Sequence, residues 1–268
     1  MTLAAYSGAK SESSGRFGIF DRVVCGVDES EESREAVRQA VLLAPAKGRV
    51  LALAVFDIDF AVHAGWASTW VAGDMEQDLE RSLGEVRAAA PRAETRLVQG
   101  RPSAALLATI EKEDATLVAL GSHGIRRSAG IAIGSVATTM LHEAPCSILV
   151  ARAPASPDAF PRAIVVGADG SPESAAALAA ARELAERLAR PLAVIAARGG
   201  KTLDLEAMRA SGTAFEIDAR HPVAALVDRA GQADLLVVGS RGLHGLRALG
   251  SVSERVAHQA PCSVLVVR

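Results

Sequence analysis

The chain has 268 residues, of which 50% are hydrophobic but only 3% aromatic, and its formal net charge at pH 7 is −2. This length predicts one or two domains, with cores built mainly from small aliphatic side chains of the kind found in buried parallel strands. The balanced charge provides no broad positive field, which argues against nucleic acid or an anionic membrane surface as a partner.

Residues 1–19 are polar in character and lack the apolar run of a signal peptide, so we expect a flexible N-terminal tail. No stretch of the chain is long and apolar enough to predict a membrane span. The three cysteines form neither a disulfide framework nor a Cys-x-x-Cys metal motif. We therefore expect a cytoplasmic protein.

Strands and helices alternate from residue 20 to residue 152. Short runs of β-branched and small apolar residues predict buried strands at 22–27, 49–56, 93–98, 116–120 and 147–151. Helices are predicted after Ser30 and at 74–90, 102–113 and 136–143. This alternation favours a parallel sheet built from right-handed crossovers.

The same alternation returns after residues 153–161, an Ala- and Pro-rich segment that we interpret as a linker. Ser171, Pro172 and Glu173 form a strong helix start, with an N-cap, a proline at the first helical position and an acid in the first turn. Strands are predicted at 163–168, 191–197, 214–218, 234–238 and 263–267, with a short helical remnant at 203–210 and a helix at 222–231.

Three sequence blocks show that the second half is a copy of the first. Residues 24–30 return at 165–171, 141 positions later; 121–124 return 118 positions later, and 134–136 return 116 positions later. The second copy has therefore lost residues between these blocks. We predict an α/β protein of two tandem Rossmann-like domains, 20–152 and a shortened 162–268, each a five-stranded parallel sheet with helices on both faces.

Two repeated blocks fall beyond the carboxyl ends of strands, where open parallel sheets bind their ligands. Asp28 follows the first strand, and residues 121–135, with the spacing G-x2-G-x9-G-S, follow the fourth strand and open a helix. Glycines allow the backbone to approach an anion closely, and a helix start supplies unpaired N–H groups and a partial positive charge. The pattern indicates a phosphate site, to which Arg126 and Arg127 can add charge.

These motifs resemble those of the universal stress protein family, in both copies and over nearly all of residues 20–268. The resemblance implies ATP as the ligand, alone or with Mg²⁺, in a stress-response switch without strong catalysis. In the first domain it implies that the base and ribose lie against Val27, Asp28, Val55 and Leu120, and the phosphates against Gly121, His123, Gly124, Arg127, Gly134, Ser135 and Val136. In the second domain the matching residues are Ala168, Asp169, Gly239, Arg241, Gly242, Gly250, Ser251, Val252 and Ser253.

Other interpretations stay open. The second glycine loop is two residues shorter, so it could bind ATP, bind it differently or be empty. The glycines and Ser135 could serve only as turn and N-cap residues, and Asp28 could only cap a turn. The protein could then be a nucleotide-free scaffold. An enzyme such as a slow ATPase is a further alternative, although no general base, paired carboxylates or metal cluster is evident.

The family resemblance also implies that the last strands of the two domains pair across a dyad. Segments 148–150 and 264–267 are apolar enough to pair in this way. The chain would form an internal pseudo-dimer, with a second chain and an unidentified protein as further partners. His142 and His258 are predicted in last helical turns, where a cation suits the helix dipole. Cys25, Cys146 and Cys262 are predicted to be small core residues.

Overall fold

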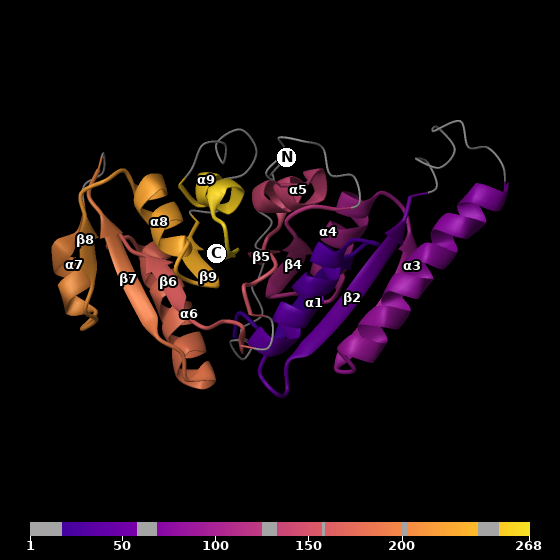
Figure 1. Ribbon diagram of the computed structural model, residues 1–268, viewed down its shortest axis with the longest axis horizontal. Helices are drawn as coiled ribbons and strands as arrows, with labels where there is room; N and C mark the ends of the chain where they lie inside the picture. The colour runs from indigo at the N-terminus through magenta and orange to yellow at the C-terminus, as the bar shows by residue number, and fades with distance from the viewer. Residues whose placement is uncertain (1–17, 58–68, 125–132, 157–158, 200–202, 241–251) are drawn as a thin grey trace, which may run out of the picture.

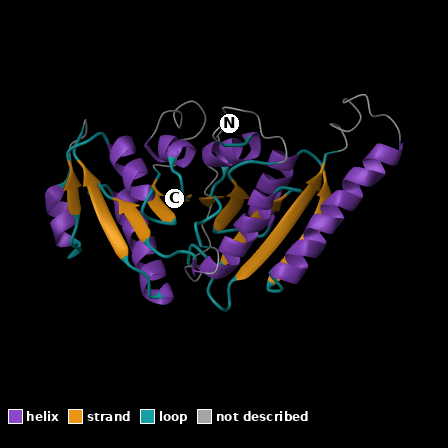
Figure 2. Ribbon diagram, viewed as in Figure 1, coloured by secondary structure: helices purple, strands orange, loops and turns teal. Residues whose placement is uncertain are grey.

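One sheet, ten-stranded within the described residues, runs through the whole molecule, with helices packed on both faces (Figures 1 and 2). The computed structural model describes residues 18–57, 69–124, 133–156, 159–199, 203–240 and 252–268. The strands are β1 (Arg22–Val27), β2 (Arg49–Phe56), β3 (Ala93–Gln99), β4 (Leu117–Gly121), β5 (Ser147–Ala151), β6 (Ile164–Gly167), β7 (Leu192–Ala197), β8 (Glu216–Asp218), β9 (Leu235–Gly239) and β10 (Ser263–Val267).

The strand order is β3-β2-β1-β4-β5-β10-β9-β6-β7-β8, so the second half repeats the order of the first when it is read from the other edge. Within each half the neighbouring strands pair in parallel. This arrangement confirms the predicted α/β fold of two Rossmann-like repeats. Segment 153–161, which we propose as the linker, lies between β5 and β6.

The helices cover the two faces of the sheet in two separate hydrophobic cores. They are α1 (Glu31–Leu43), α3 (Thr69–Ala89), α4 (Pro102–Lys112), α5 (Ser135–Glu143), α6 (Pro172–Leu188), α7 (Leu205–Ala210), α8 (Pro222–Ala230) and α9 (Val252–Gln259). One core contains buried side chains of α1, α3, α6 and α7, and the other those of α4, α5, α8 and α9. Successive strand residues alternate between them, since Val23 and Cys25 join the first core and Val24 the second.

Two elements differ from their predicted bounds. Helix α3 begins at Thr69 instead of residue 74, because the sequence holds no proline there and only a single glycine, which a helix tolerates. Strand β8 has three residues instead of five, since it pairs only with Ile195, Ala196 and Ala197 at the end of β7. The helix start signals at Ser30 and Ser171 are confirmed, because each hydroxyl accepts a hydrogen bond from the backbone N–H three residues later.

The two halves join through β5 and β10. These strands pair antiparallel, with Val150 opposite Val264 and Ile148 opposite Val266, and all five residues of each strand are buried. The expected pairing of the last strands is therefore present within one chain. Because each strand occupies the other's edge, neither is left as an open sheet edge.

Two arginines cross this junction in a reciprocal arrangement. Arg152 follows β5 and donates hydrogen bonds to the carbonyl oxygens of Ala257, at 2.6 Å, and Cys262, at 3.2 Å, near the end of α9. Arg268 follows β10 and donates to the carbonyl oxygens of Leu141 and Ala144 at the end of α5. The last carbonyls of a helix lack partners inside the helix and form the negative end of its dipole. Each half thus supplies the C-terminal cation of the other half's last helix.

His142 and His258 lie in the last turns of α5 and α9, as predicted. His142 is predicted to offset the dipole of its own helix, but its side chain also contacts the second half. Its Nε2 lies 3.0 Å from Oε1 of Glu254, in the first turn of α9. Arg268 donates hydrogen bonds to the carbonyl oxygens of Leu141 and Ala144 at the end of α5. His142 therefore connects the two halves.

The three cysteines are buried and unbridged, as predicted. Burial raises the pKa of the Cys146 thiol to about 11 and that of Cys262 to about 12. Burial also raises the pKa of Cys25 far above its usual range. All three thiols are therefore protonated at neutral pH, a state in which they are weak nucleophiles.

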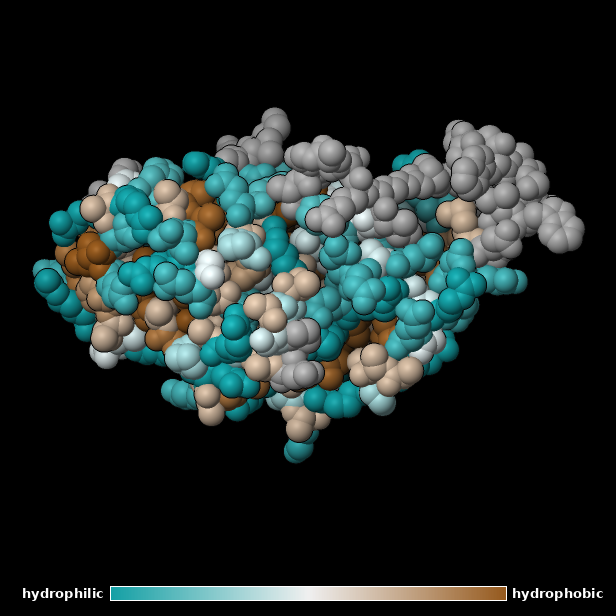
Figure 3. All heavy atoms as spheres, in the orientation of Figure 1, coloured by the Kyte–Doolittle hydropathy of each residue, from teal (hydrophilic) through white to brown (hydrophobic). Residues whose placement is uncertain are grey.

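On the face drawn in Figure 3, apolar side chains form small patches between hydrophilic ones. Leu42 and Ile217 are the large apolar residues most exposed among those that the structure describes, at 40% and 50%. Ile217 lies in β8 at one edge of the sheet, where charged Glu216 and Asp218 flank it. Charges beside an apolar edge residue discourage pairing with another strand. In the described part of the chain, no helix is long and apolar enough for a membrane span.

Arg268→Ala should loosen the junction. The substitution leaves the carbonyl oxygens of Leu141 and Ala144 without their charged donor. Hydrogen bonds from charged groups contribute roughly 1.5–3 kcal/mol, so the free energy of unfolding should fall by about 2–3 kcal/mol. Urea unfolding followed by circular dichroism measures this change. Arg209→Ala, at an exposed position of α7, is the control. Equal stability of the two variants would contradict the role of Arg268.

Acid should also weaken the junction, at His258. Burial lowers the pKa of this imidazole, Arg152 and His142 lower it further, and Glu254 raises it in part. Because the pKa is lower in the folded chain, the unfolded chain takes up the proton first as the pH falls. The free energy of unfolding should therefore decrease as the pH drops below about 6.5, the value for an unperturbed histidine. His258→Gln should make the urea midpoint less dependent on pH between 8 and 5.5; an unchanged slope would exclude this contribution.

Candidate functional site

A cavity of about 260 Å³ opens at the carboxyl ends of β1, β2 and β4, between these strands and helices α4 and α5. Ten of the eleven residues predicted for the first site line it: Val27, Asp28, Val55, Leu120, Gly121, His123, Gly124, Gly134, Ser135 and Val136. The eleventh, Arg127, lies outside the described residues, as does Arg126. The structure thus brings together two blocks that are about a hundred residues apart in sequence.

The cavity also contains residues that the sequence analysis did not identify. They are Gly26, Ser33, Leu53, Pro102, Leu106 and Ala137. Leu106 lies on α4, and only the packing of that helix over the sheet brings it to the strand ends. A signal did exist for Gly26, because the repeat retains it as Gly167. A Cβ atom at Gly26 would lie 2.5 Å from Cδ2 of Leu120, so a larger residue would collide with the cavity wall.

Asp28 braces the start of α1. Its Oδ1 accepts hydrogen bonds from the backbone N–H of Ser30, at 2.9 Å, and from the Ser30 hydroxyl. The Ser30 hydroxyl in turn caps α1 by accepting from the N–H of Ser33. Asp28 therefore does cap the turn before α1, but its carboxylate also lines the cavity. One oxygen organises the helix start while the side chain faces the cavity.

The glycine loop lies against α1 and Asp28 at distances that only glycine allows. A Cβ atom at Gly121 would lie 2.7 Å from the backbone carbon of Glu32, and one at Gly124 would lie 2.5 Å from Oδ2 of Asp28. Real Cβ atoms do not come so close to other heavy atoms. Gly121 is therefore required for the loop to approach the start of α1, and a side chain at Gly124 would have to displace the Asp28 carboxylate, so the predicted role of these glycines as mere turn residues is too limited.

The end of the loop is fixed by backbone hydrogen bonds. The N–H of Gly134 donates to the carbonyl oxygen of Ser122 at 2.8 Å, and the N–H of Ser122 donates to that of Ala151 at 2.9 Å. Gly134 is the N-cap of α5, so Ser135 is its first helical residue and the alternative of Ser135 as N-cap is wrong. The α5 start therefore faces the cavity, with N–H groups that have no partner inside the helix.

Ser122 and His123 form a pair beside the cavity. The buried Ser122 hydroxyl lies 3.0 Å from Nδ1 of His123, which fixes the orientation of the imidazole. The Ser30 hydroxyl reaches the carbonyl oxygen of His123 at 3.4 Å. These two contacts fix the position of His123, which lines the cavity.

Asp28 is the acidic residue among those that line the cavity. Glu29, the next residue, is not among them; burial raises the pKa of its carboxyl, and the carboxylates of Asp78 and Asp28 raise it further, against a lowering by Arg81. Among the described residues, however, no group of three or more His, Cys, Asp and Glu side chains has the geometry to hold a metal ion.

The second copy repeats the brace at Asp169. Its Oδ1 accepts from the N–H of Ser171 at 3.0 Å and from the Ser171 hydroxyl at 2.5 Å. A Cβ atom at Gly239 would lie 2.3 Å from the carbonyl oxygen of Glu173, which matches the approach at Gly121. Of the other residues predicted for this site, Ala168, Val252 and Ser253 are described, whereas Arg241, Gly242, Gly250 and Ser251 lie outside the described residues.

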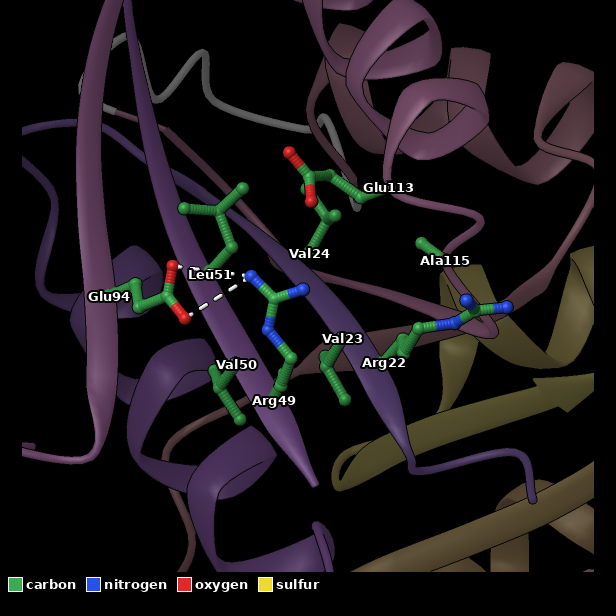
Figure 4. A pocket seen from close by; sticks show the side chains of 9 residues that line it. All are labelled: Arg22, Val23, Val24, Arg49, Val50, Leu51, Glu94, Glu113 and Ala115. Carbon is green, nitrogen blue, oxygen red and sulfur yellow. Dashed lines mark hydrogen bonds and ion pairs between the residues drawn. The ribbon is translucent and has the colours of Figure 1, made fainter. Parts of the chain in front are cut away.

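A second, much smaller cavity lies at the opposite ends of the strands (Figure 4). It has a volume of about 20 Å³ and is lined by the first residues of β1 and β2 and by Glu94, Glu113 and Ala115. Arg49 and Glu94 form an ion pair at 3.3 Å within it. Such a volume accommodates a water molecule and no organic ligand, whereas the cavity at the carboxyl ends of the strands is large enough for one.

Comparisons with known proteins agree with the geometry. The model of the universal stress protein family matches residues 19–152 and 196–268. A universal stress protein of Mycobacterium tuberculosis is 28% identical over 297 residues, covering 92% of this chain and 96% of its own length. Another from that organism is 30% identical over 188 residues, covering 58% of this chain but only 62%, less than two thirds, of its own length.

A solved structure of a universal stress protein from Archaeoglobus fulgidus covers 93% of this chain and 96% of its own, with a TM-score of 0.72 and 23% sequence identity. At this identity the likeness shows the fold. It extends through both halves, and so supports the tandem arrangement.

Gly121→Ala and Gly134→Ala should differ in stability. At Gly121 the added methyl group would overlap the α1 backbone at Glu32, whereas at Gly134 the nearest atom lies 3.7 Å away. Overpacking costs about 1–3 kcal/mol, so Gly121→Ala should lower the free energy of unfolding by that amount and Gly134→Ala by less. Chemical denaturation measures both values. A Gly121→Ala variant as stable as Gly134→Ala would show that the close approach is not a constraint.

Proposed function

The chain belongs to the universal stress protein family, and from that premise we propose that it binds ATP in the large cavity and acts as a nucleotide-dependent regulator without strong catalysis. One observation carries the proposal: apolar strand ends and a glycine-rich helix start line the same cavity. Adenosine and phosphate groups need these two environments side by side.

The apolar wall suits an adenine ring. Leu53, Val55, Leu106 and Leu120 line the cavity on the side of the sheet and α4. A flat base buries its faces against aliphatic side chains, and its exocyclic amino group can donate to a carboxylate. Asp28 provides that acceptor within the same cavity. We propose that these residues hold the base and ribose.

The opposite wall suits the phosphates. Gly124, Gly134 and Ser135 line it, and α5 begins there with its partial positive charge. The Ser135 hydroxyl can donate to a phosphate oxygen, and His123 and Arg127 can add positive charge in the proposed complex. Because the Asp28 carboxylate lines the same cavity, we propose that Mg²⁺ accompanies the triphosphate and offsets the repulsion between the carboxylate and the phosphates.

Catalysis is not part of the proposal. His123 is held by Ser122, and the second copy has Arg241 at the equivalent position in the sequence, so a role that either residue can fill is electrostatic and not acid–base. We propose that nucleotide occupancy changes the surface that a protein partner meets around residues 121–135. For the second copy we propose a site of the same kind, with the shorter loop lowering its affinity.

Gly124→Asp tests the proposal. The Cβ atom of the new side chain would lie 2.5 Å from Oδ2 of Asp28, and its carboxylate would add negative charge beside the proposed phosphate position. Titration calorimetry with ATP and Mg²⁺ should show at least a roughly 100-fold loss of affinity at the first site, equivalent to about 2.7 kcal/mol. Gly84→Asp, on α3 with open space around the Cβ position, is the matched control and should bind as the wild type does.

Two results would contradict the proposal. One is a wild-type protein that releases no adenine nucleotide on denaturation and gives no heat with ATP. The other is a Gly124→Asp variant with wild-type affinity. The first result would favour a nucleotide-free scaffold of the same fold, and rapid ATP turnover by the wild type would favour an enzyme.

A further inference from the structure

We infer that the second half of the chain regulates the first nucleotide site through helix α5, which is anchored to the second half at one end and faces the cavity at the other. This inference rests on the proposed function. It assigns a role to the second copy that does not require that copy to bind a ligand.

The amino end of α5 belongs to the site. Ser135, Val136 and Ala137 line the cavity, and Gly134 caps the helix. Any phosphate bound there depends on the position of the first N–H groups of α5 relative to the strand ends. A displacement of this helix along its axis therefore changes the affinity of the site directly.

The carboxyl end of α5 is held by the second half. Arg268 donates to the carbonyl oxygens of Leu141 and Ala144, and His142 meets Glu254 at 3.0 Å. The side chains of His142 and Glu254 are only 17% and 11% exposed, so solvent weakens their interaction little. These contacts anchor the last turn of α5 to residues of β10 and α9.

Helix α5 is short enough to transmit a displacement. Its nine residues give a length of about 13 Å at 1.5 Å per residue. Met140 is fully buried and Ala137 nearly so, which ties the helix to the sheet along its length. A rod of this kind moves as a unit, so its two ends cannot shift independently.

The connection is not symmetric. Glu254 lies in the first turn of α9, and the repeat places Thr138 at the same position of α5. The Thr138 hydroxyl donates to the carbonyl oxygen of Gly134 in its own helix. The second half thus offers a carboxylate to His142, whereas the first half has no carboxylate at the equivalent position for His258. The arginine contacts at the two helix ends are reciprocal, and the contact of His142 with Glu254 is an additional anchor of α5.

The coupling must be reciprocal, because binding free energies are linked. If the second half sets the position of α5, then ATP bound at the first site must stabilise the contact between α5 and α9. Hydrogen exchange on the wild-type protein measures this effect without any substitution. ATP with Mg²⁺, at a concentration that fills only the first site, should slow the exchange of amides 254–259 of α9, which lie outside the residues proposed for either site.

Glu254→Gln tests the opposite direction. The substitution keeps the size of the side chain but removes the charge that faces His142. Affinity for ATP at the first site should fall roughly 3- to 10-fold, the size expected for one residue in a coupling network. Glu206→Gln on α7, an exposed residue of the second half, is the control and should leave affinity unchanged. Urea unfolding establishes that both variants fold.

The outcomes separate this inference from the proposed function. A wild-type protein that binds no ATP overturns both. ATP binding at the first site with unchanged exchange at residues 254–259 and wild-type affinity of Glu254→Gln overturns the coupling alone. Slowed exchange together with reduced affinity of Glu254→Gln, but not of Glu206→Gln, supports it.

Discussion

The close approach of the glycine loop to the start of α1 is the constraint on which the cavity depends. Gly121 lies so close to the backbone at Glu32 that a side chain is excluded there, and a side chain at Gly124 would have to displace the Asp28 carboxylate. The Asp28 carboxylate itself is fixed by Ser30 at the cap of α1. Because β1 and β4 are neighbours in the sheet, this contact brings the two blocks together and leaves space beyond the strand ends.

The junction of β5 and β10 determines how the two halves contact each other. In one chain it pairs the two strands antiparallel and lets Arg152 and Arg268 cap the last helix of the opposite half. Both halves have the same order of strands and helices because of the duplication, but their sequences have diverged and some elements now differ in length. Glu254 faces His142 across the junction, while α7 is short and β8 has three residues. The second half is thus a structural partner of the first, and the ligand site proposed for it has a shortened loop in the sequence.

Much of this architecture could be predicted from the sequence, because the duplication repeats each signal. The parallel five-stranded sheet of each half and the β5–β10 pairing were expected, and the Asp28 and glycine-loop residues that are described do line one cavity. Leu106 was missed because its position depends on how α4 packs over the sheet. The contacts of Arg268 with Leu141 and of His142 with Glu254 join residues that are 127 and 112 positions apart. No local sequence pattern predicts contacts between residues so far apart. Occupancy of the site by ATP stays a prediction.

Native mass spectrometry of the intact chain with ATP and Mg²⁺ tests the central claim most directly, since it counts bound nucleotides on each molecule. The cavity of the first half predicts at least one adenine nucleotide per chain, released on denaturation, with a second one only at higher concentration if the shortened site also binds. A spectrum that shows only the bare chain at saturating ATP would contradict the account, although the fold and the junction between the halves would stand.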